Sequence, residues 1–138
     1  MNTIDNVKLL KFSELGDDDK GHLVVIEGGT NVPFEIKRVF YIYDSSNDVI
    51  RGQHANRNSE FCLINVSGTS KVRVVDQKGN EKILTLNQPH TGINIPTMIW
   101  KDMYDFSQDS ILLVLSNKHY DASEYIKDYD AFIGGGRL

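Results

Sequence analysis

The sequence contains a single cysteine, Cys62, and this scarcity excludes an internal disulfide. Because Cys62 lies in the apolar run 61–64, we expect a buried, unreactive thiol. Apolar runs are short, and none approaches the roughly 18 residues that a membrane-spanning helix needs. The polar N-terminus does not have the pattern of a signal peptide. These absences predict a cytoplasmic protein with no membrane partner.

Positive charge is also scarce. The 138 residues include 15 Lys and Arg against 19 Asp and Glu, which gives a formal net charge of −4. A nucleic-acid-binding domain would show a basic face or stripe, so nucleic acid is excluded as an expected partner. No repeat or linker divides the chain, and its length suits one domain with a sizeable core. We therefore predict a single domain over residues 1–138.

Short apolar segments separated by turn residues make up most of the chain. Residues 38–44 are rich in β-branched and aromatic side chains, which is typical of strands. Residues 70–76 and 81–86 flank a Gly-Asn turn and are predicted to form a hairpin. Further strands are predicted over 7–12, 22–27, 53–57, 92–96, 99–106 and 110–116, the last as the most buried. Short strands at spacings of about 8–12 residues indicate an antiparallel sandwich or barrel.

The C-terminal region has a different period. Asp121 and Glu124 fit a capping box, and the apolar residues that follow recur at helical spacing: Tyr125, Ile126, Tyr129, Phe132 and Ile133. Gly134-Gly135-Gly136 ends this pattern, and residues 134–138 are expected to be a disordered tail. The predicted fold is therefore all-β with one short C-terminal helix.

The segment 51–68, R-G-Q-H-A-N-R-N-S-E-F-C-L-I-N-V-S-G, has the most informative polar pattern. Residues two apart on a strand face the same side, so His54 and Asn56 would project together, into a barrel or out to solvent. The segment resembles the first signature of the cupin barrels, Gly…His-x-His-x3-Glu…Gly, with Asn56 at the second histidine. The segment G-I-N-I-P-T-M-I-W-K, at 92–101, resembles the second signature, with Lys101 at its histidine position.

Both replacements bear on metal binding. An amide is a weak ligand for a transition metal, and lysine is normally cationic. With Asn56 and Lys101 at imidazole positions, the two-histidine type of metal site is broken, and we expect no catalytic metal and no other cofactor. An iron- or manganese-dependent dioxygenase is excluded by the same argument.

A more specific resemblance extends over residues 7–132. It rests on K-G-H-L-V-V-I-E, V-P-F-E-I-K-R-V-F-Y-I-Y-D, R-G-Q-H-A-N, I-P-T-M-I-W-K-D-M-Y-D-F-S and S-N-K-H-Y-D-A-S-E-Y-I-K-D-Y, in this order. By these segments the chain resembles the dTDP-4-keto-6-deoxyhexose 3,4-ketoisomerases, the WxcM-like group of sugar-nucleotide cupins. The resemblance implies a metal-free jelly-roll β-barrel, a homodimer with exchanged N-terminal strands, and a dTDP-linked keto-deoxysugar in the barrel.

The implied reaction assigns roles to the polar residues. Moving a ketone from C4 to C3 of a hexose requires removal of the proton at C3, an enediol(ate), and protonation at C4. The base must titrate near neutral pH, so His54 is predicted as the proton shuttle. Asn56 can donate an amide N–H to the enediolate oxygen. Tyr41 can donate a phenolic hydrogen bond or relay a proton.

Charged and aromatic side chains are the candidates for substrate binding. Arg38, Arg51 and Lys101 would supply charge for the diphosphate or the developing oxyanion. Trp100 offers a flat surface for a sugar or base ring, and Lys20, where the second strand opens, is a further candidate.

Each candidate also has a structural alternative. A histidine in a strand is often a satisfied structural residue, Tyr41 and Trp100 can be ordinary packed aromatics, and Arg51 can be a solvated charge at a strand end. Lys37 and Arg38 are neighbours, so one must face outward, and the pattern does not settle which.

The leading functional hypothesis is an isomerase that converts dTDP-4-keto-6-deoxyglucose to its 3-keto isomer, in the synthesis of a 3-amino-3,6-dideoxy sugar. The second hypothesis is a related cupin that binds a nucleotide sugar without isomerase activity. The third is a 3,5-epimerase, whose chemistry also begins with a proton next to the ketone. NMR of the sugar after incubation with the protein would distinguish the three.

Overall fold

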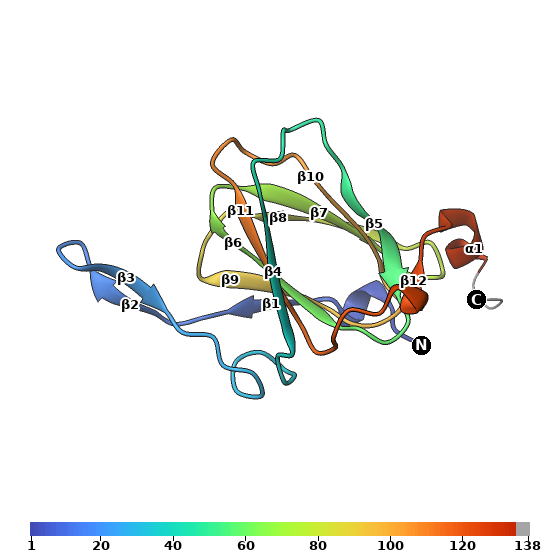
Figure 1. Cartoon of the computed structure of the whole chain (residues 1–138), viewed down its shortest axis with the longest axis horizontal. Coiled ribbons are helices and arrows are strands. Elements are labelled where there is room, and N and C mark those ends of the chain that lie inside the picture. The colour runs from blue at the N-terminus through green and yellow to red at the C-terminus, as the bar shows by residue number, and fades with distance from the viewer. Residues whose placement is uncertain (135–138) are drawn as a thin grey trace.

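Two five-stranded antiparallel sheets face each other in the computed structural model, which describes residues 1–134 (Figure 1). The first sheet has the order β1-β9-β6-β11-β4, with β1 at Lys8–Lys11, β9 at Thr91–Ile95, β6 at Phe61–Ser67, β11 at Ile111–Ser116 and β4 at Arg38–Tyr43. The second has the order β12-β5-β10-β7-β8, with β12 at Tyr125–Ile126, β5 at Arg51–Asn56, β10 at Trp100–Tyr104, β7 at Ser70–Val75 and β8 at Glu81–Leu86. The all-β, jelly-roll prediction is confirmed.

The remaining elements lie outside this pair of sheets. Strands β2 (Glu14–Asp17) and β3 (Gly21–Val24) form a separate hairpin that extends away from the barrel (Figure 1). Short 3₁₀ turns occur at Ile4–Asn6 and Ala122–Glu124, and the helix α1 covers only Tyr129–Ile133. Within residues 1–134 no helix has the length and apolarity that crossing a bilayer requires.

Strand alternation divides the apolar residues between the two faces of each sheet. On β11, Leu112 and Val114 point into the core between the sheets, whereas Leu113 and Leu115 point to the outer face of the first sheet. That outer face is covered by the segment 24–36, and Cys62 is packed within it. Burial raises the pKa of the Cys62 thiol to about 12, in agreement with the expected unreactive cysteine.

The outer face of the second sheet has its own cover. Helix α1 places Phe132, which is fully buried, against Ala55, Val75 and Trp100 of the sheet. Asp128 caps the helix, because its carboxylate accepts a hydrogen bond from the backbone N–H of Ala131 at 3.1 Å. This docking fixes the C-terminal segment alongside β5.

The predicted short C-terminal helix is confirmed as α1, but its predicted start at Asp121 is wrong. Tyr125 and Ile126 form β12, which pairs with Asn56 and Ala55 of β5, because the free edge of the sheet supplies backbone partners and the outer face buries Ile126. The predicted order of burial is also wrong, since β9 is buried at every position and β11 is not. The predicted tail, apart from Gly134 at the end of α1, lies outside the described residues.

Asp76 connects the N-terminal segment to the β7–β8 turn. It is fully buried, and its carboxylate accepts hydrogen bonds from the backbone N–H groups of Ile4 at 3.1 Å and of Lys78 and Asn80 at 3.0 Å. Burial alone would raise the pKa of Asp76, but these hydrogen bonds, with one from the Asn80 side chain, outweigh it and lower the pKa.

Replacing Asp76 by alanine should lower the free energy of unfolding by about 2 kcal/mol, because three backbone N–H groups lose the buried carboxylate that accepts their hydrogen bonds. The folded pKa is lowered, so this stabilisation is present above the unfolded pKa and is lost as the pH falls through the folded pKa. Urea denaturation of Asp76→Ala measures the loss of stability. Asp18→Ala, which removes an exposed carboxylate in the β2–β3 turn, is the control. Equal losses in the two variants would contradict the assignment.

Candidate active site in the barrel

A β-bulge lies immediately before His54. Lys101 of β10 is opposite His54, but Asp102 is opposite Gly52, so Gln53 is an extra residue on β5. Gly52 and Gln53 both have positive φ, at 82° and 57°, and a Cβ on Gly52 would lie 2.9 Å from the Lys101 carbonyl oxygen. Position 52 therefore requires glycine. The bulge bends β5 and sets the direction in which His54 projects.

His54 is held in one tautomer. Its Nδ1 lies 2.9 Å from the carbonyl oxygen of Gly52, and because a carbonyl can only accept, Nδ1 carries the proton. The Nε2 atom is left with a free lone pair. Burial, and secondly the charge of Lys101, lower the pKa of His54 to about 4, so the imidazole is neutral at pH 7. His54 therefore has the protonation state of a base.

His54 lines a cavity of about 240 Å³ between the two sheets. The cavity is bounded by polar groups of β5 and β10 and by apolar and aromatic groups of the facing strands. Its wall includes Arg51, His54, Phe61, Lys101, Met103 and Tyr125. The Tyr125 ring lies 4.7 Å from the His54 imidazole, measured between centroids. The cavity thus combines a neutral imidazole with a mostly apolar wall.

Lys101 is buried in the same wall, with only 3% of its surface exposed. Its ammonium donates a hydrogen bond to Asn56 Oδ1 at 3.0 Å, lies 3.5 Å from the Ile99 carbonyl oxygen, and sits 4.9 Å from the centroid of the Phe61 ring. Burial lowers the pKa of Lys101 to about 7, opposed by the negative charge of Glu124. The amine and ammonium forms are therefore both accessible near neutral pH.

Glu124 is the carboxylate whose negative charge acts on both Lys101 and His54. Its carboxylate accepts hydrogen bonds from the backbone N–H groups of Asn58 and Ser59, each at 2.8 Å, and from the Ser59 hydroxyl. Burial would raise the pKa of Glu124, but these hydrogen bonds, with a contribution from the Asn56 amide, lower it. Asn56, 1% exposed, accepts a hydrogen bond from Lys101 through Oδ1, whereas its Nδ2 is buried without a hydrogen-bond partner among the described residues. Asn56 does not line the cavity.

Arg38, and not the exposed Lys37, is the inward member of its pair. Its guanidinium lies 5.6 Å from the Phe61 ring centroid, and Nη1 lies 3.5 Å from the Tyr125 hydroxyl. Within residues 1–134, its Nε and Nη2 atoms are buried without a hydrogen-bond partner. Buried donors of this kind are normally satisfied, so Arg38 has capacity for an anionic group beside the cavity.

The structure does not bring the other predicted residues to His54. Tyr41 borders the cavity, but it is 62% exposed and shares its strand face with Leu113, on the outside of the sheet. Trp100 is buried beneath α1, with its ring centroid 5.1 Å from that of Tyr129. Lys20 is exposed in the turn of the β2–β3 hairpin. Their catalytic and binding roles stay predictions.

Sequence reasoning missed Tyr125, Phe61 and Glu124. The spacing of Tyr125 from Tyr129 fits a helical period, and Glu124 fits a capping box, so the pattern predicts a helix for both. The structure shows that the short segment after Asp121 pairs with β5 as a strand instead of forming a helix. The helical spacing in the sequence does not reveal this competing strand pairing.

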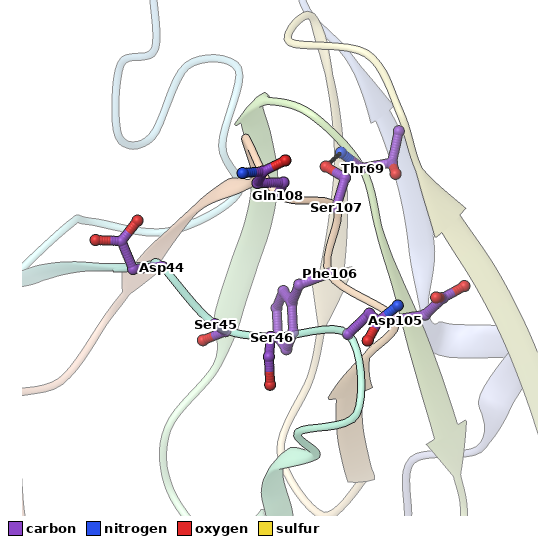
Figure 2. A pocket seen from close by; sticks show the side chains of 9 residues that line it. Asp44, Ser45, Ser46, Thr69, Asp105, Phe106, Ser107 and Gln108 are labelled. Atoms are coloured by element: carbon purple, nitrogen blue, oxygen red, sulfur yellow. Dashed lines mark hydrogen bonds between the residues drawn. The ribbon is translucent and has the colours of Figure 1, made fainter.

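Two larger hollows lie at the surface. One, of about 540 Å³, is formed by the β4–β5, β6–β7 and β10–β11 connections, and in Figure 2 Asp44 and Asp105 lie on either side of the Phe106 ring. Two carboxylates and the absence of histidine and lysine from its lining make it unsuited to a diphosphate or to proton transfer near neutral pH.

The second hollow, of about 550 Å³, adjoins the active-site cavity through neighbouring aromatic rings. Tyr120 belongs to its lining, and its ring centroid is 5.7 Å from that of Tyr125. The lining also contains Arg57, Lys118 and His119. No group of three metal-ligating His, Cys, Asp or Glu residues occurs in the part of the chain that the structure describes.

Comparison with known proteins places this geometry in context. Residues 5–135 match the family model described as "WxcM-like, C-terminal". The TDP-4-oxo-6-deoxy-alpha-D-glucose-3,4-oxoisomerase of Aneurinibacillus thermoaerophilus is 37% identical over 125 residues, which are 91% of this chain and 88% of that protein.

Solved structures of 3,4-ketoisomerases are also similar to this chain. The sugar 3,4-ketoisomerase QdtA of Thermoanaerobacterium thermosaccharolyticum, in complex with TDP, is 40% identical, with a TM-score of 0.88 and coverage of 94% of this chain and 93% of that one. WlaRA, a TDP-fucose-3,4-ketoisomerase of Campylobacter jejuni, is 47% identical, with a TM-score of 0.86 and 93% coverage of each chain. A dTDP-4-dehydrorhamnose 3,5-epimerase of Bacillus anthracis, at 15% identity and a TM-score of 0.75, shares the fold alone. The chain belongs to the WxcM-like family of sugar-nucleotide cupins.

Proposed function

We propose that this protein is a sugar-nucleotide 3,4-ketoisomerase acting on dTDP-4-keto-6-deoxyglucose. The observation that carries the proposal is the cavity between the sheets, in which a neutral His54 lies directly opposite a buried Lys101. Relatives that cover nearly the whole chain are named for this reaction on TDP sugars.

His54 supplies the proton transfer at carbon. Its Nε2 lone pair removes the proton at C3 of the sugar, and the protonated imidazole later returns a proton to C4. A pKa of about 4 makes the isolated imidazole a weak base. The negative charge that develops on the C4 oxygen as the C3 proton leaves stabilises the imidazolium while it forms.

Arginines supply the positive charge for the substrate. Arg51 is exposed at the cavity edge, where a diphosphate that stays partly solvated can bind it. Arg38 has open, buried donors next to Phe61 and Tyr125, which suits an oxyanion or a phosphate oxygen closer to the barrel interior. Both guanidiniums remain charged throughout the reaction.

The hypothesis of a protein that only binds the nucleotide sugar rests on Asn56 and Lys101 in place of groups that could handle protons. The position of Asn56 weakens it, because the amide is buried behind Lys101 and does not line the cavity. An imidazole at that position would not be the group closest to the ligand. The isomerase is therefore the function that the site supports best.

We also propose a cytoplasmic role for the reaction in the synthesis of a 3-amino-3,6-dideoxy sugar for a polysaccharide. A ketone at C3 is the group that an aminotransferase can convert to an amine. Supply of the 4-keto substrate requires prior oxidation at C4 of the same nucleotide sugar.

The β2–β3 hairpin supports a homodimer with exchanged N-terminal segments. The hairpin forms a sheet of its own, away from the barrel, and exposes 53% of Leu15 and 58% of Leu23. An isolated hairpin is marginally stable in water, so a second copy of the chain is the natural cover. In the structure β1 pairs with β9 of its own chain, so the segment that we propose to cross to the partner is the projecting hairpin and not residues 7–12.

Light scattering at micromolar concentration should give twice the 15.6 kDa of one chain. The double variant Leu15→Asp/Leu23→Asp should give a monomer, because it places charges on the covered face. Ile83→Asp, at a site on β8 that is 55% exposed, is the matched control and should leave the dimer intact. A monomeric native protein would reject the proposal.

Replacing His54 by asparagine should lower turnover by about 10²–10⁴, because the variant keeps a hydrogen-bonding side chain but loses the base. In D2O, NMR should show deuterium at C4 of the product with the native enzyme and none with the variant. Affinity for dTDP, measured by calorimetry, should change little. A near-native rate in His54→Asn would remove His54 from the mechanism.

The His54 imidazole should stay neutral as the pH falls to about 4, whereas an unperturbed histidine titrates at about 6.5. Because the folded pKa is below the unfolded one, protonation favours the unfolded chain between these two values, and stability decreases as the pH falls through them. Nitrogen-15 NMR of labelled imidazoles measures the pKa of His54. His54→Asn assigns the signal by removing it, and the control His119→Asn should leave the His54 signal unchanged. Titration of His54 near 6.5 would contradict its burial.

A further inference from the structure

The inference rests on the proposed isomerase and concerns a proton that His54 does not carry. When the ketone moves from C4 to C3, the oxygen on C4 gains a proton and the oxygen on C3 loses one. His54 accounts for the carbon-bound proton, which leaves C3 and arrives at C4. A second group is needed for the exchange between the two oxygens.

Lys101 is placed to face the same part of the substrate as His54. The two residues are directly opposite each other on β10 and β5, and both line the cavity. Directly opposed residues of an antiparallel pair have Cβ atoms about 4.5–5.5 Å apart, a span that the adjacent C3 and C4 of a sugar can bridge. Among the described residues, Lys101 is the single lysine in the lining.

We propose that Lys101 is the acid–base group that transfers the proton from the C3 oxygen to the C4 oxygen. As His54 removes the C3 proton, the Lys101 ammonium gives a proton to the C4 oxygen, and a neutral enediol results. The Lys101 amine then takes the proton from the C3 oxygen as the carbonyl forms there, and the imidazolium protonates C4. Both side chains return to their starting states, and no external oxidant or reductant is needed.

The surroundings of Lys101 allow it to lose and regain a proton. Its hydrogen-bond contacts are the neutral Asn56 amide oxygen at 3.0 Å and the Ile99 carbonyl at 3.5 Å, and no carboxylate of residues 1–134 forms an ion pair with it. A directly paired carboxylate would hold the ammonium charged. With burial, the pKa falls to about 7.

Other charged and titratable groups near the cavity come from every neighbouring strand. Arg51 and His54 belong to β5, Arg38 and Tyr41 to β4, and Tyr125 to β12. Burial of the side chain disfavours a proton on Lys101. Glu124, next to β12, is the anion whose charge opposes this effect of burial.

Asn56 acts as the positioning residue for Lys101. Its Oδ1 accepts from the lysine Nζ, and an amide does not titrate, so it fixes the amine without competing for the proton. The Asn56 Nδ2 makes no hydrogen bond within the described residues, so Lys101 is the hydrogen-bond partner of this amide. An asparagine at this position therefore suits a lysine that works as an acid and base.

The test compares Lys101→Arg with Lys101→Met on dTDP-4-keto-6-deoxyglucose in D2O. Arginine keeps the charge but does not give up its proton. Lys101→Arg should therefore retain deuterium exchange at C3 of the substrate within about tenfold, and lose 3-keto product formation by about 10²–10⁴. Lys101→Met should lose both. Near-native isomerisation by Lys101→Arg would overturn the proposal, because charge alone would then suffice.

A second measurement is made on the native protein and does not depend on turnover. Carbon-13 NMR of labelled lysine Cε in the native protein should show one lysine that titrates at about 7, with Lys101→Met to assign it. Titration of every lysine near about 10.4 would also overturn the proposal. Native protein that produces no 3-keto sugar would instead reject the proposed function, while the lysine titration would still report on Lys101.

Discussion

The pairing of β5 with β10 is the constraint on which the site depends. The Gly52–Gln53 bulge shifts the register so that His54 and Lys101 meet across the strands. In an interior of low dielectric, two adjacent positive charges are unfavourable, and the charge of Lys101 accordingly disfavours a proton on His54. A resting site with one cation and one neutral base follows from this pairing, before any substrate enters.

Elements at the edge and on the outer face of the second sheet stabilise the β5–β10 pairing. Strand β12 extends the sheet beyond β5, and α1 closes its outer face over Ala55 and Trp100. The turn that precedes β12 carries Glu124, whose hydrogen bonds to Asn58 and Ser59 fix the end of β5. The C-terminal segment is therefore part of the support for the candidate site, although it is far from His54 in sequence.

Much of this fold is predictable from the sequence because alternation and turn residues mark each strand. The shared face of His54 and Asn56 also follows from spacing. The position of β12 does not, because Tyr125 and Tyr129 fit a helical period and only the free edge of β5 decides against it. The bulge at Gln53 is not predictable from the sequence, because it is defined by the register in which β5 pairs with β10. The low pKa of Lys101 depends on burial by residues from several strands, and the outward face of Tyr41 depends on its pairing with Leu113.

Trp100 has a consequence for how the molecule can be observed. It is the single tryptophan of the chain, it is 4% exposed, and its indole N–H donates to Asp102 at 3.2 Å beneath α1. Indole fluorescence shifts to longer wavelength when water reaches the ring. Emission from this protein therefore reports the seating of one short helix on the outer face of the second sheet. Detachment of that helix would be visible as a red shift even while the barrel itself remained folded.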